Sequence, residues 1–250
     1  MKSKLPSRVC LGSLLLAVAL SNQAREITDM AGRKVTIPDK ITKVYAAQPY
    51  TNVLMYIVAP DLMVGLLSPP REESKRFVRP EAAALPVLGT APGGAGAGTP
   101  PGGGGTGAQA GELATGTLPG ARGGRSQVNL EAVLALKPDF ALAKGGPNTN
   151  VTRTEEQFAK ISLPVVFVDI DRIADYPAGI EFVGKLLGRE ERALKLSAYA
   201  TRILTDVEKV VAAIPPEKRV RVYYAESADG LATESDKSFH ADAIRLAGGS

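Results

Sequence analysis

Residues 128–143 constrain the fold more than any other stretch, because they predict a helix, a proline stop and a buried strand in succession. Apolar residues recur at helical spacing up to Leu136, Asn129 suits a helix start, and Pro138 prevents the helix from continuing. The apolar run that follows, residues 140–143, has the length of a strand. A helix followed directly by a wholly apolar strand is typical of a parallel sheet covered on both faces.

Similar units before and after this stretch predict one α/β lobe over residues 25–188. The elements expected in it are a hairpin at 27–38 with a turn at Ala31 and Gly32, strands at 43–47, 63–67, 85–89, 140–143 and 164–168, and helices at 51–58, 71–79 and 152–161, with a last helix from Asp175 to Gly188.

Beyond the lobe, residues 190–213 form the longest segment with helical periodicity. Residues with apolar side chains recur along it, and just after it, at three- and four-residue steps: Leu196, Tyr199, Ile203, Val207, Val210 and Ile214. After it we expect a buried strand at 220–225, which would begin a second sheet, and a helix at 239–247.

The first 24 residues predict a secretory signal peptide. Basic residues Lys2, Lys4 and Arg8 precede an apolar run at 10–20 and small residues suited to cleavage. The alternative is a buried N-terminal helix. The single cysteine, Cys10, lies before the apolar run, which is the wrong place for lipid attachment. Its removal leaves a mature chain without thiols, which fits an oxidising compartment, so we expect a periplasmic product.

Composition excludes several classes of function. Of the net charge of +4, three positive charges lie in the first 24 residues, so the remainder gives no electrostatic footprint for nucleic acid. A single histidine excludes a three-histidine metal site within this chain. No run of 18 apolar residues predicts a membrane span.

A glycine- and proline-rich insert interrupts the lobe at residues 90–127, and its composition predicts a disordered loop. The glycines Gly102, Gly104 and Gly107 fit a dinucleotide fingerprint by spacing. Two prolines precede them instead of a strand, so we reject a nucleotide site there.

Candidate ligand residues follow the predicted strands, because ligands bind open α/β sheets at the carboxyl edge. Tyr50 offers an aromatic face with a polar tip, although it could simply pack against the helix start. His240, the only histidine, could bind a metal or a chelate, or only begin a helix. The full set is Gln48, Pro49, Tyr50, Thr51, Asn52, Lys144, Gly145, Asn148, Glu226, Asp229 and His240.

Three sequence motifs also resemble those of a known protein family. They are I-T-D-x-x-G-R-x-V-x-I-P at 27–38, N-L-E-x-(apolar)-L-x-L-K-P-D at 129–139, and D-G-L-x-T…S-x-H…I-x-L-A-G-G at 229–249. Together they resemble periplasmic binding proteins of ABC importers for ferric siderophores, haem and cobalamin. The insert at 90–127 departs from that pattern.

The resemblance implies two α/β lobes joined by a long helix, here residues 189–214, with a ligand held between them. It implies a receptor that acts as a monomer, without a cofactor and without chemistry on its ligand. The receptor would deliver an iron or cobalt chelate to an ABC permease with its ATPase. In the family a glutamate on each lobe docks onto permease arginines, and Glu131 matches the first of them. Residues 215–250 would be an incomplete second lobe, as expected of a truncated chain.

Two alternatives remain open. One is a receptor for a free metal ion such as nickel, zinc or manganese, although its usual cluster of histidines and carboxylates is missing. The other is an exported α/β enzyme using acid–base pairs from Asp169, Asp171, Glu226 and Asp229. The chain has neither a G-x-S-x-G elbow nor a phosphate-binding loop, which favours the receptor.

Overall fold

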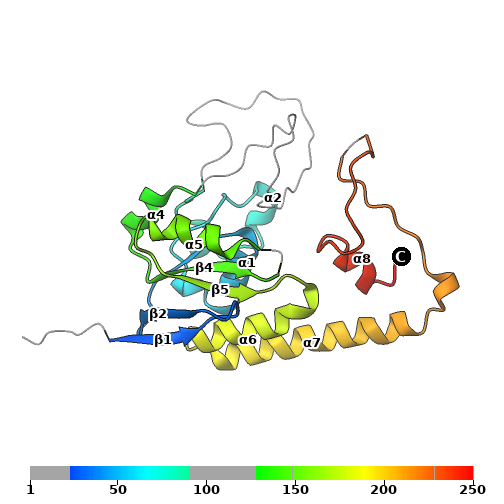
Figure 1. The fold of residues 1–250 in the computed structure, drawn as a ribbon, viewed down its shortest axis with the longest axis horizontal. Helices are drawn as coiled ribbons and strands as arrows, with labels where there is room; N and C mark the ends of the chain where they lie inside the picture. The colour runs from blue at the N-terminus through cyan, green and yellow to red at the C-terminus, as the bar shows by residue number, and fades with distance from the viewer. Residues whose placement is uncertain (1–22, 90–127, 148, 228, 250) are drawn as a thin grey trace, which may run out of the picture.

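A computed structural model of the chain describes residues 23–89, 128–147, 149–227 and 229–249, which are coloured in Figure 1. At its centre lies a three-stranded parallel sheet, in the order β3-β4-β5. The strands are β3 (Val44–Ala46), β4 (Phe140–Gly145) and β5 (Val165–Asp169). All residues of β4 except Lys144 are buried, as expected for a central strand covered on both faces. The predicted α/β fold is confirmed.

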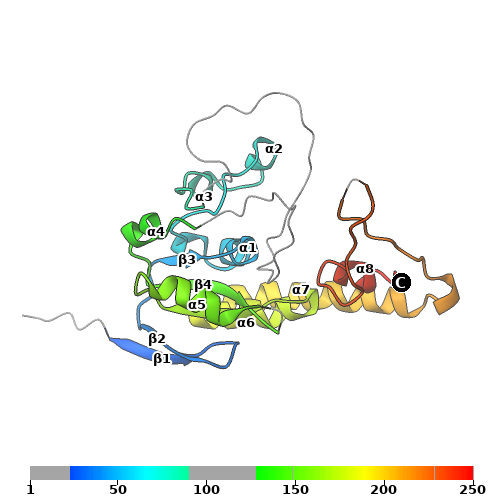
Figure 2. The same cartoon turned by 45° about the horizontal axis from the view of Figure 1, so that its top comes forward.

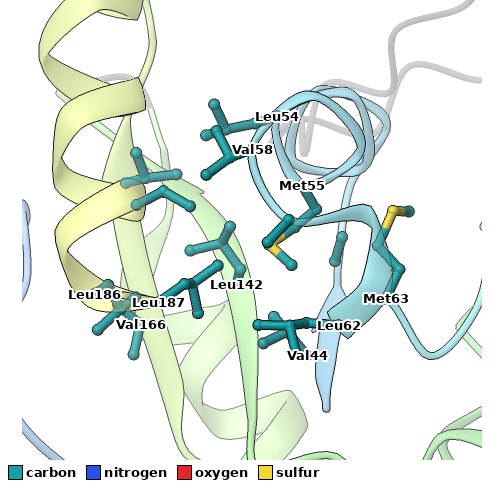
Figure 3. Close-up of a cluster of buried hydrophobic side chains, with 14 of the residues drawn as sticks. Val44, Leu54, Met55, Val58, Leu62, Met63, Leu142, Val166, Leu186 and Leu187 are labelled. Carbon is teal, nitrogen blue, oxygen red and sulfur yellow. The ribbon is translucent and has the colours of Figure 1, made fainter. Parts of the chain in front are cut away.

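Helices cover both faces of this sheet. Helices α1 (Pro49–Val58) and α6 (Tyr176–Leu186) pack on one face, and α4 (Leu130–Leu136) and α5 (Val151–Ala159) on the other. Side chains of each strand alternate between the two cores, because successive residues of a strand point to opposite faces. Figure 3 shows the core under α1 and α6, where Leu142 of β4 meets Met55 and Val58 of α1.

The helix–proline–strand unit forms as predicted. Asn129 begins α4, with its side-chain oxygen accepting a hydrogen bond from the Ala132 N–H at 3.0 Å. The helix ends at Leu136, and Lys137 takes a left-handed conformation with φ of 50°. Pro138 then leads the chain into β4 through Asp139, whose carboxylate accepts hydrogen bonds from the loop before β3.

The predicted hairpin is also present, as β1 (Ala24–Thr28) paired antiparallel with β2 (Lys34–Pro38). Gly32 in its turn has φ of +77°, which glycine adopts without strain. Asp29 is buried at the turn, and its carboxylate accepts hydrogen bonds from the Arg33 guanidinium at 3.0 Å and the Phe167 N–H at 3.2 Å. One carboxylate thus closes the turn and ties the hairpin to β5.

The longest helix, α7 (Glu190–Ala212), leaves the lobe and leads to the C-terminal segment, as Figures 1 and 2 show. Its first turns pack closely on α6, where Gly184 lies against Ala193. The apolar stripe continues beyond this contact, but Tyr199, Ile203 and Val210 are exposed. None of the described helices is long and apolar enough to cross a membrane.

Five elements differ from the sequence prediction. Residues 220–225 do not form a buried strand: Val220 and Tyr223 are 70% and 64% exposed, and one bridge, between Ala225 and Thr233, is the pairing found there. The reason is that a strand needs a neighbour, and the described residues supply none. The predicted helix at 71–79 shrinks to α2 (Glu72–Lys75), because its charged sequence has no apolar face to bury.

The strands predicted at 63–67 and 85–89 are reduced to isolated bridges, Val44 with Met63 and Leu66 with Val87. They continue the sheet beyond β3. The remaining short elements are α3 (Pro80–Ala83), α8 (Asp242–Leu246) and single 3-10 turns at Pro60–Leu62, Ile173–Asp175 and Pro216–Lys218. The helix predicted at 239–247 is therefore shorter than expected. The predicted signal peptide, up to residue 22, and the predicted disordered insert at 90–127 lie outside the described residues.

Candidate functional site

The loop after β3 is fixed by its own side chains. The Gln48 side-chain oxygen accepts a hydrogen bond from the Lys144 N–H at 2.7 Å, which joins this loop to the end of β4. Thr51 is fully buried and donates to the Gln48 carbonyl at 2.9 Å. The Asn52 amide donates to the Ala46 carbonyl at 2.8 Å. These three residues hold the loop in place. Tyr50, in the same loop, faces the C-terminal segment.

Lys144 is the centre of the carboxyl edge. Its ammonium lies 2.7 Å from the Asp171 carboxylate, and the two side chains are 13% and 6% exposed. The same nitrogen lies 5.3 Å from the ring centre of Tyr50 and 4.6 Å from that of Phe239. Cations are attracted to the faces of aromatic rings at such distances. Lys144 therefore connects the lobe to a segment almost one hundred residues away in the chain.

The aromatic rings complete this contact. Tyr50 and Phe239 meet edge to face, with ring centres 6.3 Å apart, a favourable geometry for aromatic pairs. Burial raises the pKa of the Tyr50 hydroxyl. The pKa of Tyr176 is raised as well, first by burial and then by the neighbouring Tyr50. Both hydroxyls remain protonated at neutral pH and offer neutral polar groups at the edge.

The His240 ring lies next to the Phe239 ring, with ring centres 4.0 Å apart, and the centre of the Tyr224 ring is 6.2 Å from that of His240. Its Nδ1 is 2.7 Å from a Glu234 carboxylate oxygen and 3.5 Å from one of Glu226. The hydrogen bond with Glu234, and secondarily burial and the Glu234 charge, raise the pKa of Glu226. Hydrogen bonds from Ser238 and Glu226, with His240 contributing, lower the pKa of Glu234 to about 2. The two carboxylates and the imidazole thus form one cluster of interacting groups.

Asp242 anchors this segment to the lobe. One of its carboxylate oxygens accepts a hydrogen bond from the Ile173 N–H at 2.8 Å, and the other pairs with Arg245 at 2.7 Å and Arg172 at 3.3 Å. Burial by itself would raise the pKa of Asp242, but these hydrogen bonds and the two guanidinium charges outweigh burial and hold it below its ordinary value. The anchor is two residues from His240 and positions it over the sheet edge.

The structure brings some predicted residues together and separates others. Gln48, Tyr50 and Lys144 meet at the edge, and Glu226 and His240 meet in the C-terminal segment. By contrast, Asp229 is exposed and accepts the Leu231 N–H at 3.0 Å within its own turn. The other predicted residues make no such contact: Pro49 is exposed at the first turn of α1, Gly145 is buried in β4 against Phe167, Glu131 is exposed in the first turn of α4, and Asn148 lies outside the described residues.

Sequence reasoning missed three residues of the site and misjudged a fourth. Phe239, Glu234 and Tyr224 were not singled out, because each depends on how an irregular segment folds back. Asp171 entered only as part of an enzymatic alternative, whereas the structure pairs it with Lys144. Proximity to His240 in sequence was a usable signal for Phe239 and Glu234. A separate pocket of about 410 Å³ lies behind α8 and is lined mainly by apolar residues such as Val222 and Ile244.

Comparison with known proteins identifies the family. A family model described as periplasmic binding protein matches residues 110–250. The molybdate-binding protein MolA of Haemophilus influenzae is 29% identical over 250 residues, which cover 86% of this chain and 59% of MolA. An ABC transporter solute binding protein from Sulfurospirillum deleyianum superposes with a TM-score of 0.69 at 30% identity, over 90% of this chain and 61% of that one.

The periplasmic vitamin B12 binding protein BtuF of Vibrio cholerae has a TM-score of 0.57 at 16% identity, over 84% of this chain and 65% of BtuF, and shows the shared fold. The chain thus spans about three fifths of the length of the relatives that it matches. The family model covers more than half of the chain, and the fold is that of the structural neighbours. The chain belongs to the periplasmic binding protein family.

Proposed function

We propose that this protein is the solute receptor of an ABC importer and that its ligand carries a metal centre, as an iron or cobalt chelate such as a siderophore, haem or a corrinoid. The observation that carries the proposal is the convergence of Tyr50 and Lys144, at the sheet edge, with Phe239 and His240 of the C-terminal segment. A ligand there would lie against aromatic faces and beside an imidazole, a common donor to iron and cobalt.

Charge argues against the oxyanion named for MolA. In the described part of the site the one lysine, Lys144, is already paired with Asp171, while Glu226 and Glu234 add carboxylates. A molybdate ion would approach these carboxylates without a free cation to compensate them. A metal centre with open coordination positions is attracted by the same groups.

Family membership and the predicted signal peptide together support export and delivery. Residues 1–24 would direct secretion to the periplasm, and the exposed Glu131 would dock on a permease that works with an ATPase. Capture between two lobes requires no chemistry on the ligand, so no enzymatic role is proposed.

Direct binding tests the proposal. The full-length protein should retain haem, cyanocobalamin or a ferric hydroxamate in equilibrium dialysis and should not retain molybdate. Tyr50→Ala should weaken that binding, because it removes an aromatic face, whereas Tyr199→Ala, which removes an exposed tyrosine on α7, should not. Retention of molybdate alone would overturn the ligand class, and turnover of a bound compound would overturn the receptor.

A free transition-metal ion is the second candidate. A specific observation favours it: His240, Glu226 and Glu234 place their ligand atoms within 4.8 Å of one another. This cluster places two carboxylates beside the single histidine, which the sequence analysis did not predict.

A further inference from the structure

Three side chains of the C-terminal segment have the composition of a metal site. Glu226 and Glu234 offer carboxylate oxygens and His240 offers Nδ1. The side chains of Glu234 and His240 are 18% and 23% exposed, and that of Glu226 is 36% exposed. They are partly covered yet open enough for an ion to enter.

The spacing of the donor atoms fits a common ion. Two ligand atoms that each lie ~2.1 Å from a metal are about 3.0 Å apart at a right angle and about 3.4 Å apart at the tetrahedral angle. Nδ1 of His240 lies 2.7 Å from Glu234 and 3.5 Å from Glu226. The observed distances bracket these values, so an ion can be held with small side-chain adjustments.

The surroundings already orient the donors. The Ser238 hydroxyl accepts a hydrogen bond from the His240 N–H at 3.0 Å, and the same serine hydrogen-bonds Glu234. Phe239 and Tyr224 flank the imidazole ring, and Asp242 fixes the backbone that follows. Supporting contacts of this kind hold metal ligands in place in known sites.

We propose that Glu226, Glu234 and His240 bind a divalent transition-metal ion directly. The proposal rests on the receptor function above and names the chemistry that its site selects. One imidazole nitrogen and two carboxylates suit Fe²⁺, Co²⁺, Ni²⁺ or Zn²⁺ better than Mg²⁺ or Ca²⁺, which prefer oxygen ligands alone. Three ligands leave coordination positions open, which water fills for a free ion and other donors fill for an ion that arrives in a chelate.

Electrostatics gives the site a reason to prefer a cation. The two carboxylates place oxygen atoms within 4.8 Å of each other, and two negative charges at that distance repel. A divalent ion held between them neutralises both groups. The described residues near this cluster include no arginine or lysine in contact with its carboxylates.

The test is a titration of the untagged full-length protein with Co²⁺, followed by the visible absorption of the bound ion, and repeated with Ni²⁺ by calorimetry. Glu234→Gln and His240→Ala should each weaken binding by roughly 100-fold, because loss of a direct ligand costs at least as much as loss of a supporting contact. Asp236→Asn, an exposed carboxylate in the same segment, is the matched control and should bind as the wild type does. Thermal melting of each variant shows that the lobe is intact.

The outcomes separate the two proposals. Saturable Co²⁺ binding that both ligand variants lose supports the site. If haem, cyanocobalamin or a ferric hydroxamate binds equally well to wild type and Glu234→Gln, and neither ion binds, the metal site is refuted while the receptor stands. If the folded protein binds neither ions nor chelates, both are refuted. Binding of the ions at wild-type affinity by the ligand variants also refutes the site.

Discussion

Asp242→Asn is the most direct perturbation of the contact between the C-terminal segment and the lobe. The carboxylate is 7% exposed and connects α8 to the turn at Ile173–Asp175 through the Ile173 N–H and Arg172. Asparagine has nearly the same shape and can still accept one hydrogen bond. It loses the charge that holds both guanidinium groups.

The magnitude follows from these contacts. Hydrogen bonds to charged groups contribute about 1.5–3 kcal/mol, and partly exposed ion pairs add at most about 1 kcal/mol. Arg172 is 53% exposed, so its pair counts for little, and a neutral hydrogen bond to Ile173 remains. The Arg245 pair lies within the segment itself and does not hold it to the lobe. Docking loses the difference between a charged and a neutral hydrogen bond, about 1 kcal/mol, and the partly exposed Arg172 pair, at most about 1 kcal/mol. We therefore expect a loss of roughly 1–2 kcal/mol, which corresponds to a roughly 5- to 30-fold shift from docked toward undocked segment.

Acid should reproduce the effect of the substitution. The pKa of Asp242 in the folded protein lies below its ordinary value, because the hydrogen bonds and guanidinium charges outweigh burial. The stabilisation is therefore complete above the ordinary aspartate pKa of about 3.9 and is lost as the pH falls through that value toward the folded pKa. Docking should weaken below about pH 4 in the wild type, and this change should be absent from Asp242→Asn.

Amide hydrogen exchange measures this equilibrium. Exchange at α8 should accelerate roughly 5- to 30-fold in Asp242→Asn, whereas exchange in β4 and β5 stays unchanged and serves as the internal reference. Asp236→Asn is the control, since that side chain is exposed and accepts its hydrogen bond from the neighbouring Ser235. Equal exchange at α8 in both variants, or acceleration in β4 as well, would refute the anchor.

Other substitutions test the packing and the partner surface. Gly184→Ala places a Cβ 2.1 Å from that of Ala193. The substitution should therefore lower the free energy of unfolding by about 1–3 kcal/mol, although alanine has the better helix propensity. Adding Ala193→Gly should restore part of this free energy in a urea melt, and no rescue would rule out the clash. Asp29→Ala should lower the free energy of unfolding by roughly 1.5–3 kcal/mol, because the Arg33 guanidinium and the Phe167 N–H lose a charged hydrogen-bond partner while Arg33 keeps its pair with Glu155. A urea melt measures this, and an unchanged midpoint is the contrary result. Glu131→Ala should abolish ligand uptake by cells and leave dialysis affinity unchanged, since this glutamate is exposed in the first turn of α4, on the side of the molecule opposite α8. Normal uptake would exclude its docking role.

Much of the lobe could be predicted from sequence because its signals are local. The helix–proline–strand unit at 128–143 carries an N-cap, a helix terminator and an apolar run within sixteen residues, and each acts on its neighbours alone. The same holds for the hairpin with Gly32 in its turn. Strand ends then placed Gln48, Tyr50 and Lys144 at one edge, because parallel strands share an edge.

The C-terminal segment was less predictable because its conformation depends on distant partners. Residues 220–225 have the composition of a strand, yet without a neighbouring strand among the described residues their apolar side chains are exposed. The stripe on α7 likewise has helical spacing, but spacing does not show what covers it, and only its first turns pack on α6.

Sequence alone thus determined the α/β class, the sheet edge that carries candidate ligand residues, and the single histidine as a further candidate. It could do so because periodicity, capping and residue type are properties of short stretches. Tertiary structure decided which groups meet: Phe239 with Tyr50 and Lys144, Asp171 with Lys144, and Glu226 and Glu234 with His240. These contacts join residues from different elements or from opposite ends of an irregular loop. No local pattern encodes them, because each depends on how separate parts of the chain come together, and Phe239 reaches the lobe because Asp242 fastens the returning segment there.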